Sequence, residues 1–209
     1  MPLDYAVSAL VTLVVVVDPI GLAPVFLSLT QGLSPAAQRS VALRAAIIAA
    51  ATLGGFALAG AWFLQQLGIS LPAFRISGGL LLFAIAFEMV YGQRTDRQAR
   101  TADQAIHKDR AHHIAAFPLA IPLLAGPGAI TATLLLAGQA AGRPTLLAVL
   151  LVTVAAVGVL CVLVFYFAAR IGRALGTTGN LVLSRLLGIV LAALAVQYVI
   201  DGVRAAFAA

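Results

Sequence analysis

Long stretches without charge dominate the pattern of hydrophobic and polar positions along the chain. A helix that spans a bilayer needs about 20 consecutive, mostly apolar residues. Six blocks of this kind cover residues 6–29, 43–64, 70–90, 114–137, 145–169 and 181–203. The pattern therefore predicts an all-α membrane protein with six transmembrane helices, and the blocks leave no room for a separate soluble domain.

The composition excludes a soluble globular enzyme. Hydrophobic residues make up 62% of the 209 residues, charged residues make up 10%, and the mean hydropathy is +1.07. Soluble domains contain about 45–50% apolar and about 25% charged residues. The net charge of +6 does not indicate a nucleic-acid partner, because the positive residues lie between the apolar blocks. A single cysteine excludes a disulfide framework.

The distribution of Lys and Arg predicts the orientation in the membrane. The face reached after the first, third and fifth blocks has nine of them, and the opposite face has Arg143 and Arg204. Basic loops stay in the cytoplasm. We therefore expect a multi-pass protein of the bacterial inner membrane with loop 91–113 cytoplasmic and both termini periplasmic or external. The nine residues are Arg39, Arg44, Arg94, Arg97, Arg100, Lys108, Arg110, Arg170 and Arg173.

Two halves of three blocks each show a weak internal repeat. Pro19 in the first block matches Pro127 in the fourth. The third block begins FRISGG with Arg75, and the sixth begins SRLLG with Arg185, at nearly the same offset along the chain. An odd number of spans per half requires the second half to enter the membrane upside down, which is the inverted-repeat plan of many secondary transporters. The alternative is chance alignment of Gly and Pro in helices rich in Ala and Leu.

The repeat divides one transmembrane domain, 1–209, into three parts. Repeat one is expected over 1–92 and repeat two over 112–209. Between them lies a cytoplasmic linker, 93–111, whose mixed charges are typical of a solvated segment. Three histidines, His107, His112 and His113, lie at the end of this linker. The adjacent pair, His112 and His113, would face different directions on a helix. We therefore interpret all three as interfacial residues, not metal ligands.

Prolines near the middle of the first and fourth blocks predict two broken helices. Proline ends or kinks a helix, and irregular backbone at membrane depth is tolerated only inside protein or beside a water-filled cavity. In each block, proline can begin a new half-helix with Asp18 or Gly126 as its N-cap. The free N–H groups of such half-helices attract an anion such as a carboxylate; the alternative is a proline kink used for packing. The predicted substrate-binding residues are Asp18, Pro19, Gly21, Gly126, Pro127, Gly128 and Thr131.

Asp18 is the only acid deep inside a block. Such a residue is costly in a bilayer and usually has a partner or faces a cavity. It can cap the half-helix, bind a substrate ammonium group, or carry a proton in a coupling cycle. Arg75 and Arg185 each begin a block, and their relation by the repeat indicates gating or coupling roles on opposite sides of the membrane. The alternative for both arginines is snorkelling to the lipid headgroups.

Four strings together resemble the MarC family of bacterial and archaeal membrane proteins: VDPIGLAPVFLSL, FRISGGLLLFAIAFEMV, FPLAIPLLAGPGAITAT and SRLLGIVLAALAVQYVIDGV. The resemblance covers nearly the whole chain in order and spacing. It departs from the family at Leu22, where the family usually has an asparagine after DPIG. The resemblance implies six spans and membership of a group named neutral amino acid transporters.

These observations predict a secondary transporter of small neutral amino acids or similar small polar metabolites across the cytoplasmic membrane. The coupling ion is either H⁺ through Asp18 or Na⁺ through carbonyl groups freed at the breaks. The other classes considered are a passive channel, a membrane scaffold and, less favoured, an integral membrane lipid phosphatase, which would need several acids and a nucleophile in one site. We expect no catalytic residues, no metal and no cofactor.

Overall fold

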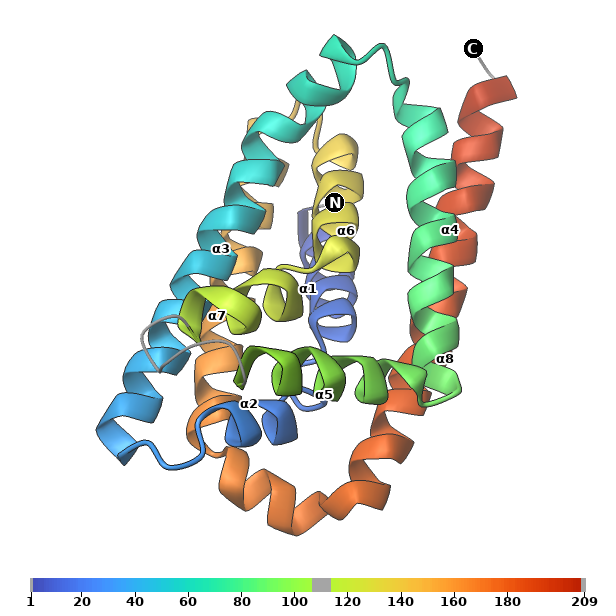
Figure 1. The fold of residues 1–209 in the computed structure, drawn as a ribbon. Helices are drawn as coiled ribbons and strands as arrows, with labels where there is room; N and C mark the ends of the chain where they lie inside the picture. Colours follow the sequence, from blue (N-terminus) through green and yellow to red (C-terminus); the bar gives the residue numbers. More distant parts are fainter. Residues whose placement is uncertain (1, 107–113, 208–209) are drawn as a thin grey trace.

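The computed structural model describes residues 2–106 and 114–207, and every regular element in that part of the chain is helical (Figure 1). His107, Lys108, Arg110, His112 and His113 lie outside the described residues. The elements are α1 (Pro2–Val17), α2 (Ala23–Leu29), α3 (Pro35–Gln66), α4 (Leu71–Val90), α5 (Gln93–Ile106), η1 (Ala115–Leu124), α6 (Pro127–Gln139), α7 (Pro144–Tyr166) and α8 (Ala168–Phe207).

All six apolar blocks fall on helices, and four described helices are long and apolar enough to cross a membrane without a break. These are Pro35–Gly60 of α3, Leu71–Val90, Pro144–Tyr166 and Ala168–Phe207. Side chains fix where two of them begin: Ser34 accepts a hydrogen bond from the Ala37 N–H, and Ser70 accepts one from the Ala73 N–H. Serine N-caps of this kind satisfy a backbone donor that the helix itself leaves free.

The first and fourth blocks are broken, as the prolines predict. The fourth block divides into η1 and α6, which meet at an angle of 58° and together form a fifth candidate span. Within η1, Phe117 and Ile121 have extended backbone, because the residue before a proline is pushed out of the helical region. The first block divides into α1, a turn and α2. With 16 residues, α1 is about 24 Å long, shorter than the bilayer core of about 30 Å.

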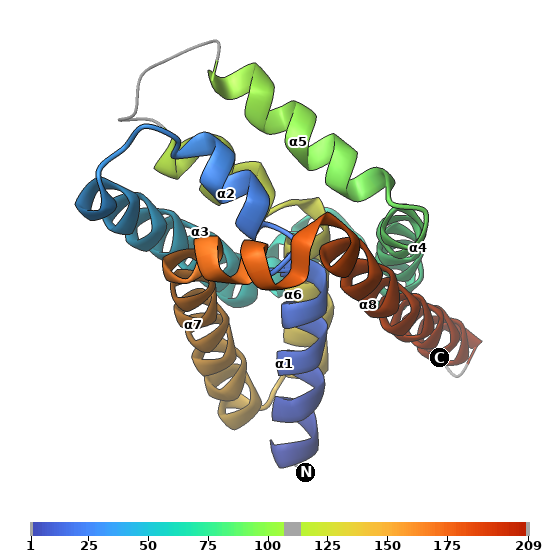
Figure 2. The ribbon, with the colours of Figure 1, turned by 90° about the horizontal axis from the view of Figure 1, so that it is seen from below.

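Helix α8 begins before the sixth block and bends at Gly176, which has a positive φ of 60°. Its first part runs along one end of the molecule, and the rest, which contains block 181–203, runs back toward the other end (Figures 1 and 2). Glycine adopts this backbone conformation without the steric cost that a Cβ would add.

Three pairs of helices pack against each other antiparallel: α4 with α8, α3 with α7, and α1 with α6 (Figures 1 and 2). The α4–α8 contact is reciprocal. A Cβ on Gly79 would lie 2.8 Å from the carbonyl oxygen of Ala195, and a Cβ on Gly188 would lie 3.1 Å from that of Ala86. The offset along the chain from Gly79 to Gly188 equals the offset from Ala86 to Ala195. The two helices therefore touch through backbone at two matching points.

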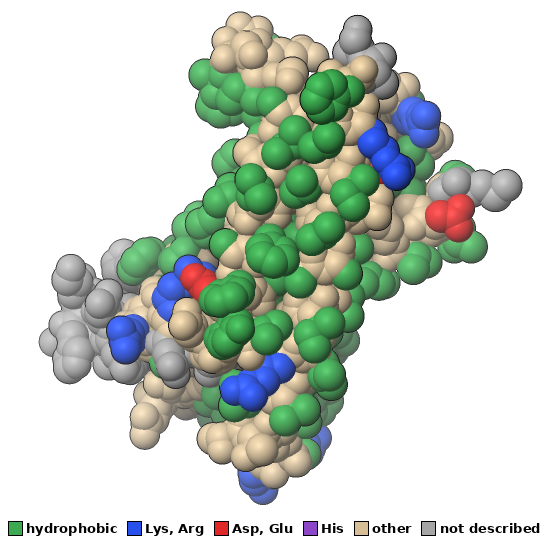
Figure 3. Space-filling model, turned by 90° about the vertical axis from the view of Figure 1, so that its right-hand side faces the viewer, with side chains coloured by type: hydrophobic (Ala, Val, Ile, Leu, Met, Phe, Trp, Pro, Cys, Tyr) green, Lys and Arg blue, Asp and Glu red, His purple; other side chains and the backbone are tan. Residues whose placement is uncertain are grey.

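Many large apolar side chains remain on the outside of this helix assembly. Figure 3 shows hydrophobic side chains across one face with few charges among them. On α4 and α8, Leu80, Leu186 and Ile189 are each more than half exposed, at 58%, 56% and 58%. An apolar surface of this extent is unusual for a soluble monomer and fits contact with lipid.

Helix α5 forms the described part of the predicted linker 93–111. It packs across the end of the molecule against α2, α4 and η1 (Figure 2). Arg94 and Gln98 are each only 7% exposed. One face of this polar helix covers the ends of the broken helices. The start of α1 and the end of α8 lie away from α5 (Figure 1).

Candidate functional site

At the first break the chain turns on Asp18, which is 2% exposed and has a positive φ of 53°. Its Oδ1 accepts a hydrogen bond from the Gly21 N–H at 3.1 Å, and its Oδ2 accepts one from the Ser184 hydroxyl at 3.5 Å. Asp tolerates left-handed backbone better than most residues because its short side chain bonds locally. A Cβ on Gly21 would lie 2.7 Å from the Asp18 Cγ, so glycine leaves room for this carboxylate.

The second half-helix at this break begins later than predicted. Helix α2 has Leu22 as its N-cap, with a proline in its first turn, so Asp18 is not the N-cap of α2. Asp18 instead closes the preceding turn, in which the Leu22 N–H also donates to the Asp18 carbonyl at 3.1 Å. The side chain of Asp18 bonds the turn at Gly21 and Ser184 of α8, and the start of α2 lies further along the chain.

At the second break, α6 begins as predicted, with Gly126 as the N-cap and Pro127 at the first helical position. A Cβ on Gly126 would collide with the carbonyl oxygen of Pro122, and a Cβ on Gly128 would collide with Ile85 and lie 3.3 Å from Val16. These glycines therefore let the chain turn sharply and let α6 begin against α1 and α4.

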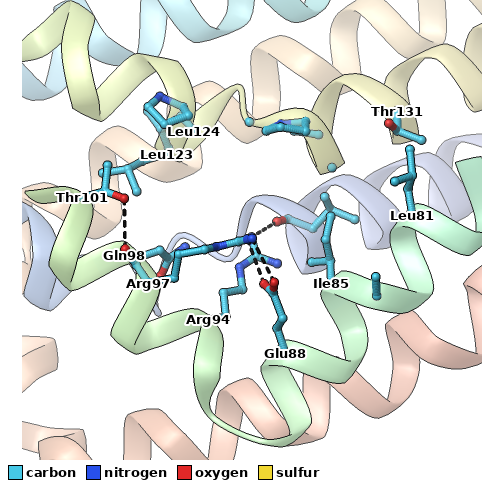
Figure 4. Close-up of a pocket in the computed structure, with 17 residues that line it drawn as sticks. Leu81, Ile85, Glu88, Arg94, Arg97, Gln98, Thr101, Leu123, Leu124 and Thr131 are labelled. Carbon is cyan, nitrogen blue, oxygen red and sulfur yellow. Dashed lines mark hydrogen bonds and ion pairs between the residues drawn. The ribbon is translucent and has the colours of Figure 1, made fainter.

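A cavity of about 400 Å³ lies where α6 begins, between α4, α5 and the η1–α6 break (Figure 4). We call it the α5 cavity. Much of its wall is apolar, including Leu81, Ile85, Leu123 and Leu124. Its polar lining consists of Glu88, Arg94, Arg97, Gln98, Thr101 and Thr131. An apolar hollow with a few converging polar groups is the usual form of a small-molecule site.

Arg94 connects this cavity to the first break. Its guanidinium donates hydrogen bonds to the carbonyl oxygen of Val16, at the end of α1, and to the Met89 sulfur at 3.3 Å. Burial lowers the pKa of Arg94, and the nearby carboxylate of Asp18 opposes that change. Arginine is not deprotonated in proteins, so the side chain stays charged. A buried cation is thus fixed beside the broken end of α1.

Arg97 and Glu88 form a bidentate ion pair at the edge of the cavity, with distances of 2.9 Å for Nη1–Oε1 and 2.8 Å for Nη2–Oε2 (Figure 4). The Arg97 side chain is 60% exposed and that of Glu88 is 26% exposed. The charges of Arg97 and Glu88 neutralise each other. Arg94 is buried in the cavity wall, and among the described residues no carboxylate forms an ion pair with it. No group of three or more His, Cys, Asp or Glu in the described ranges could hold a metal ion.

The structure brings some of the predicted site residues together and not others. Gly126, Pro127, Gly128 and Thr131 line the α5 cavity. Asp18, Pro19 and Gly21 are buried but are not among its lining residues, and Val16 is the residue of α1 that reaches the wall. Substrate binding by all seven residues stays a prediction.

The two predicted gating arginines have different surroundings. Arg75 lines a second hollow of about 620 Å³, which we call the α8 hollow, together with Gln139, Tyr198, Asp201, Arg204 and Ala205. Arg185 is exposed on α8 and contacts no polar partner in the part of the chain that the structure describes. Their gating roles also stay predictions.

Sequence reasoning missed Arg94, Gln98 and Thr101, which α5 presents to the cavity. Their spacing in the sequence could have indicated a shared face. Gln98 follows Arg94 by four residues and Thr101 follows Gln98 by three, so all three lie on one face of a helix. The charges of the linker hid it, because a mixture of Asp and Arg is typical of a solvated segment. Ser184 was missed as well, because nothing in the sequence connects it with Asp18.

Comparisons with known proteins agree with this architecture. The family model described as MarC family integral membrane protein matches residues 3–207. A UPF0056 membrane protein of the archaeon Methanocaldococcus jannaschii is 36% identical, with 99% of each chain covered. Relatives with that same name occur in Bacillus subtilis, at 32% identity over 99% of this chain and 98% of the relative, and in Escherichia coli, at 33% over 91% and 88%. No solved structure matches this chain. The chain belongs to the MarC family of integral membrane proteins.

Proposed function

We propose that this protein is a secondary transporter, not an enzyme, that moves small neutral amino acids or similar small polar metabolites across the cytoplasmic membrane. The observation that carries the proposal is the α5 cavity, which is walled by the start of a half-helix in a broken span. In many transporters the substrate binds at such breaks, because free N–H groups and the positive end of the half-helix are available there.

The pairing of equivalent helices supports six spans arranged as two inverted repeats. A two-fold axis in the membrane plane makes equivalent helices antiparallel and makes their contacts reciprocal. The α4–α8 pair has both properties, through Gly79 with Ala195 and Gly188 with Ala86. Leu82 and Leu191, which are related by the same offset along the chain, are both completely buried. The proposal makes α1 and α2 together one broken span, equivalent to η1 and α6.

The placement of α5 supports the proposed orientation. The described basic residues at this end come from the start of α3, from α5 and from the start of α8, and they include Arg39, Arg97 and Arg170. The N-terminal end of α1 and the C-terminal end of α8 lie away from them. Because basic residues stay on the cytoplasmic side, α5 would cover the cavity from the cytoplasm, and the α8 hollow with Arg75 would open on the other side.

Asp18 is the residue that we propose for coupling to H⁺. It is buried at the first break and close enough to Arg94 for their charges to interact. Loss of the Asp18 charge would weaken the hydrogen bond by which Arg94 binds the Val16 carbonyl at the end of α1. Protonation of Asp18 would in this way be coupled to movement at the α5 cavity. The alternative of Na⁺ bound by backbone carbonyls at the breaks requires no charge on Asp18.

Uptake into proteoliposomes tests the proposal. Purified protein is reconstituted, and radiolabelled alanine, serine and glycine are supplied with an inward H⁺ gradient, an inward Na⁺ gradient or neither. Accumulation above equilibrium with one gradient supports a secondary transporter. Equilibration that ignores both gradients would show a channel instead, and absence of flux for all three amino acids would reject transport of this substrate class.

A further inference from the structure

The α5 cavity contains hydrogen-bond donors that the described chain leaves unused. The first N–H groups of an α-helix have no partner within the helix, and α6 begins in the cavity wall at Pro127, which has no N–H itself. The groups left free are those of Gly128 and Ala129, which both line the cavity. They lie at the positive end of a 13-residue helix, where an anion is stabilised.

A buried amide independently indicates a ligand at the same place. Gln98 is 7% exposed and lines the cavity. Among the described residues its side chain has no hydrogen-bond partner, although buried polar groups are normally paired. A bound molecule that accepts a hydrogen bond would satisfy it.

The charges in the cavity select the kind of group that fits. Arg94 is buried there and donates one hydrogen bond to Val16 and one to Met89. A guanidinium has five N–H donors, so others remain for a ligand. Glu88, the one acid in the lining, is occupied by Arg97. Asp18 does not line the cavity. The lining therefore offers a cation and free donors, but no free carboxylate for an ammonium group.

We propose that the cargo is recognised through a carboxylate group, held by the Arg94 guanidinium, the Gln98 amide and the N–H groups of Gly128 and Ala129. The amino group of an amino acid contributes little to this recognition. Small 2-hydroxy acids should therefore bind about as well as the amino acids of the same size. This inference rests on the proposed function, because it names the chemical group by which the transported molecule is held.

Binding of three matched probes to the purified full-length protein tests the inference. L-alanine, L-lactate and L-alaninamide have similar size, and only the first two have a carboxylate. Titration calorimetry in detergent, at constant ionic strength, should give alanine and lactate dissociation constants within about tenfold of each other. Alaninamide should bind at least tenfold more weakly than alanine.

Two variants locate the binding. Gln98→Leu removes the amide at similar volume and should weaken alanine and lactate alike by at least fivefold. Gln93→Leu makes the same replacement at an exposed position of α5 that does not line the cavity, so it is the matched control and should leave both acids within twofold. Circular dichroism checks that each variant is folded.

Several outcomes would overturn the proposal: binding of alaninamide as tight as that of alanine, no binding of either acid, or unchanged binding in Gln98→Leu. Failure of the proposed function is a different result. Binding without any flux in proteoliposomes would reject the transporter and keep the carboxylate site, whereas flux of alanine unaffected by Gln98→Leu would reject the site and keep the transporter.

Discussion

Removal of the Arg94 charge should destabilise the protein, and removal of the Asp18 charge should reverse part of that loss. In Arg94→Met the side chain keeps an unbranched apolar stem and loses its hydrogen bond to the Val16 carbonyl. Hydrogen bonds to charged groups contribute about 1.5–3 kcal/mol. The variant also leaves Asp18, which is 2% exposed, without its neighbouring positive charge.

The expected loss in the free energy of unfolding for Arg94→Met is about 2–4 kcal/mol. Breaking a buried pair costs about 3–5 kcal/mol, and we expect less because Arg94 and Asp18 form no direct ion pair within the described residues. Asp18→Asn keeps an acceptor for the Gly21 N–H and should cost about 1 kcal/mol. The double variant should be at least about 1 kcal/mol more stable than the sum of the single losses predicts, because it leaves no unbalanced buried charge.

Unfolding in mixed micelles of neutral detergent and dodecyl sulfate, followed by circular dichroism, gives the four free energies of this cycle. Arg97→Gln serves as the control for loss of an arginine from α5, and an exposed ion pair of this kind contributes at most about 1 kcal/mol. If the two single effects add to within about 0.5 kcal/mol, Arg94 and Asp18 do not interact, and the link between the two breaks is refuted.

Three further predictions concern transport, packing and topology. Asp18→Asn should stay stably inserted while gradient-driven uptake falls at least about tenfold, which corresponds to about 1.4 kcal/mol in a barrier; uptake at the wild-type rate with the same ion dependence would reduce Asp18 to a structural role. Gly79→Ala should lower the free energy of unfolding by about 1–3 kcal/mol, because its Cβ would lie 2.8 Å from a backbone oxygen of α8. The control Gly55→Ala, where a Cβ would meet nothing within 4 Å, should be neutral or stabilising. Equal effects of the two variants would contradict the close α4–α8 contact. A cysteine at position 103 in a Cys161→Ala background should resist an impermeant thiol reagent added outside intact cells, and labelling there would contradict the proposed orientation.

The helices and the second break could be predicted because local chemistry determines them. Apolar runs give the helices, and Gly126-Pro127-Gly128 supplies both an N-cap and a first helical residue. The start of α2 could not be placed, because its position depends on how the Asp18 carboxylate folds back onto Gly21.

The polar residues that α5 brings to the cavity were not predicted, because tertiary contacts place them there. In the sequence, Arg94 looks like any arginine of a polar linker. In the structure, α5 lies against the end of α1, and the Arg94 guanidinium donates to the Val16 carbonyl that the broken helix leaves free. Glu88 lines the same cavity and pairs there with Arg97 of α5. Helical spacing in this polar segment, and not its charge, indicates the face that lines the cavity.

We propose that the α5 cavity opens in turn to each side of the membrane. Thr131 is 7% exposed and lines this cavity, and cysteine is close to threonine in size. In a Cys161→Ala background, Thr131→Cys is reconstituted in one orientation, and an impermeant thiol reagent is added to one side at a time, with and without alanine. Alternating access predicts labelling from both sides and slower labelling when alanine is present. Labelling from one side only, at a rate that alanine does not change, would contradict it.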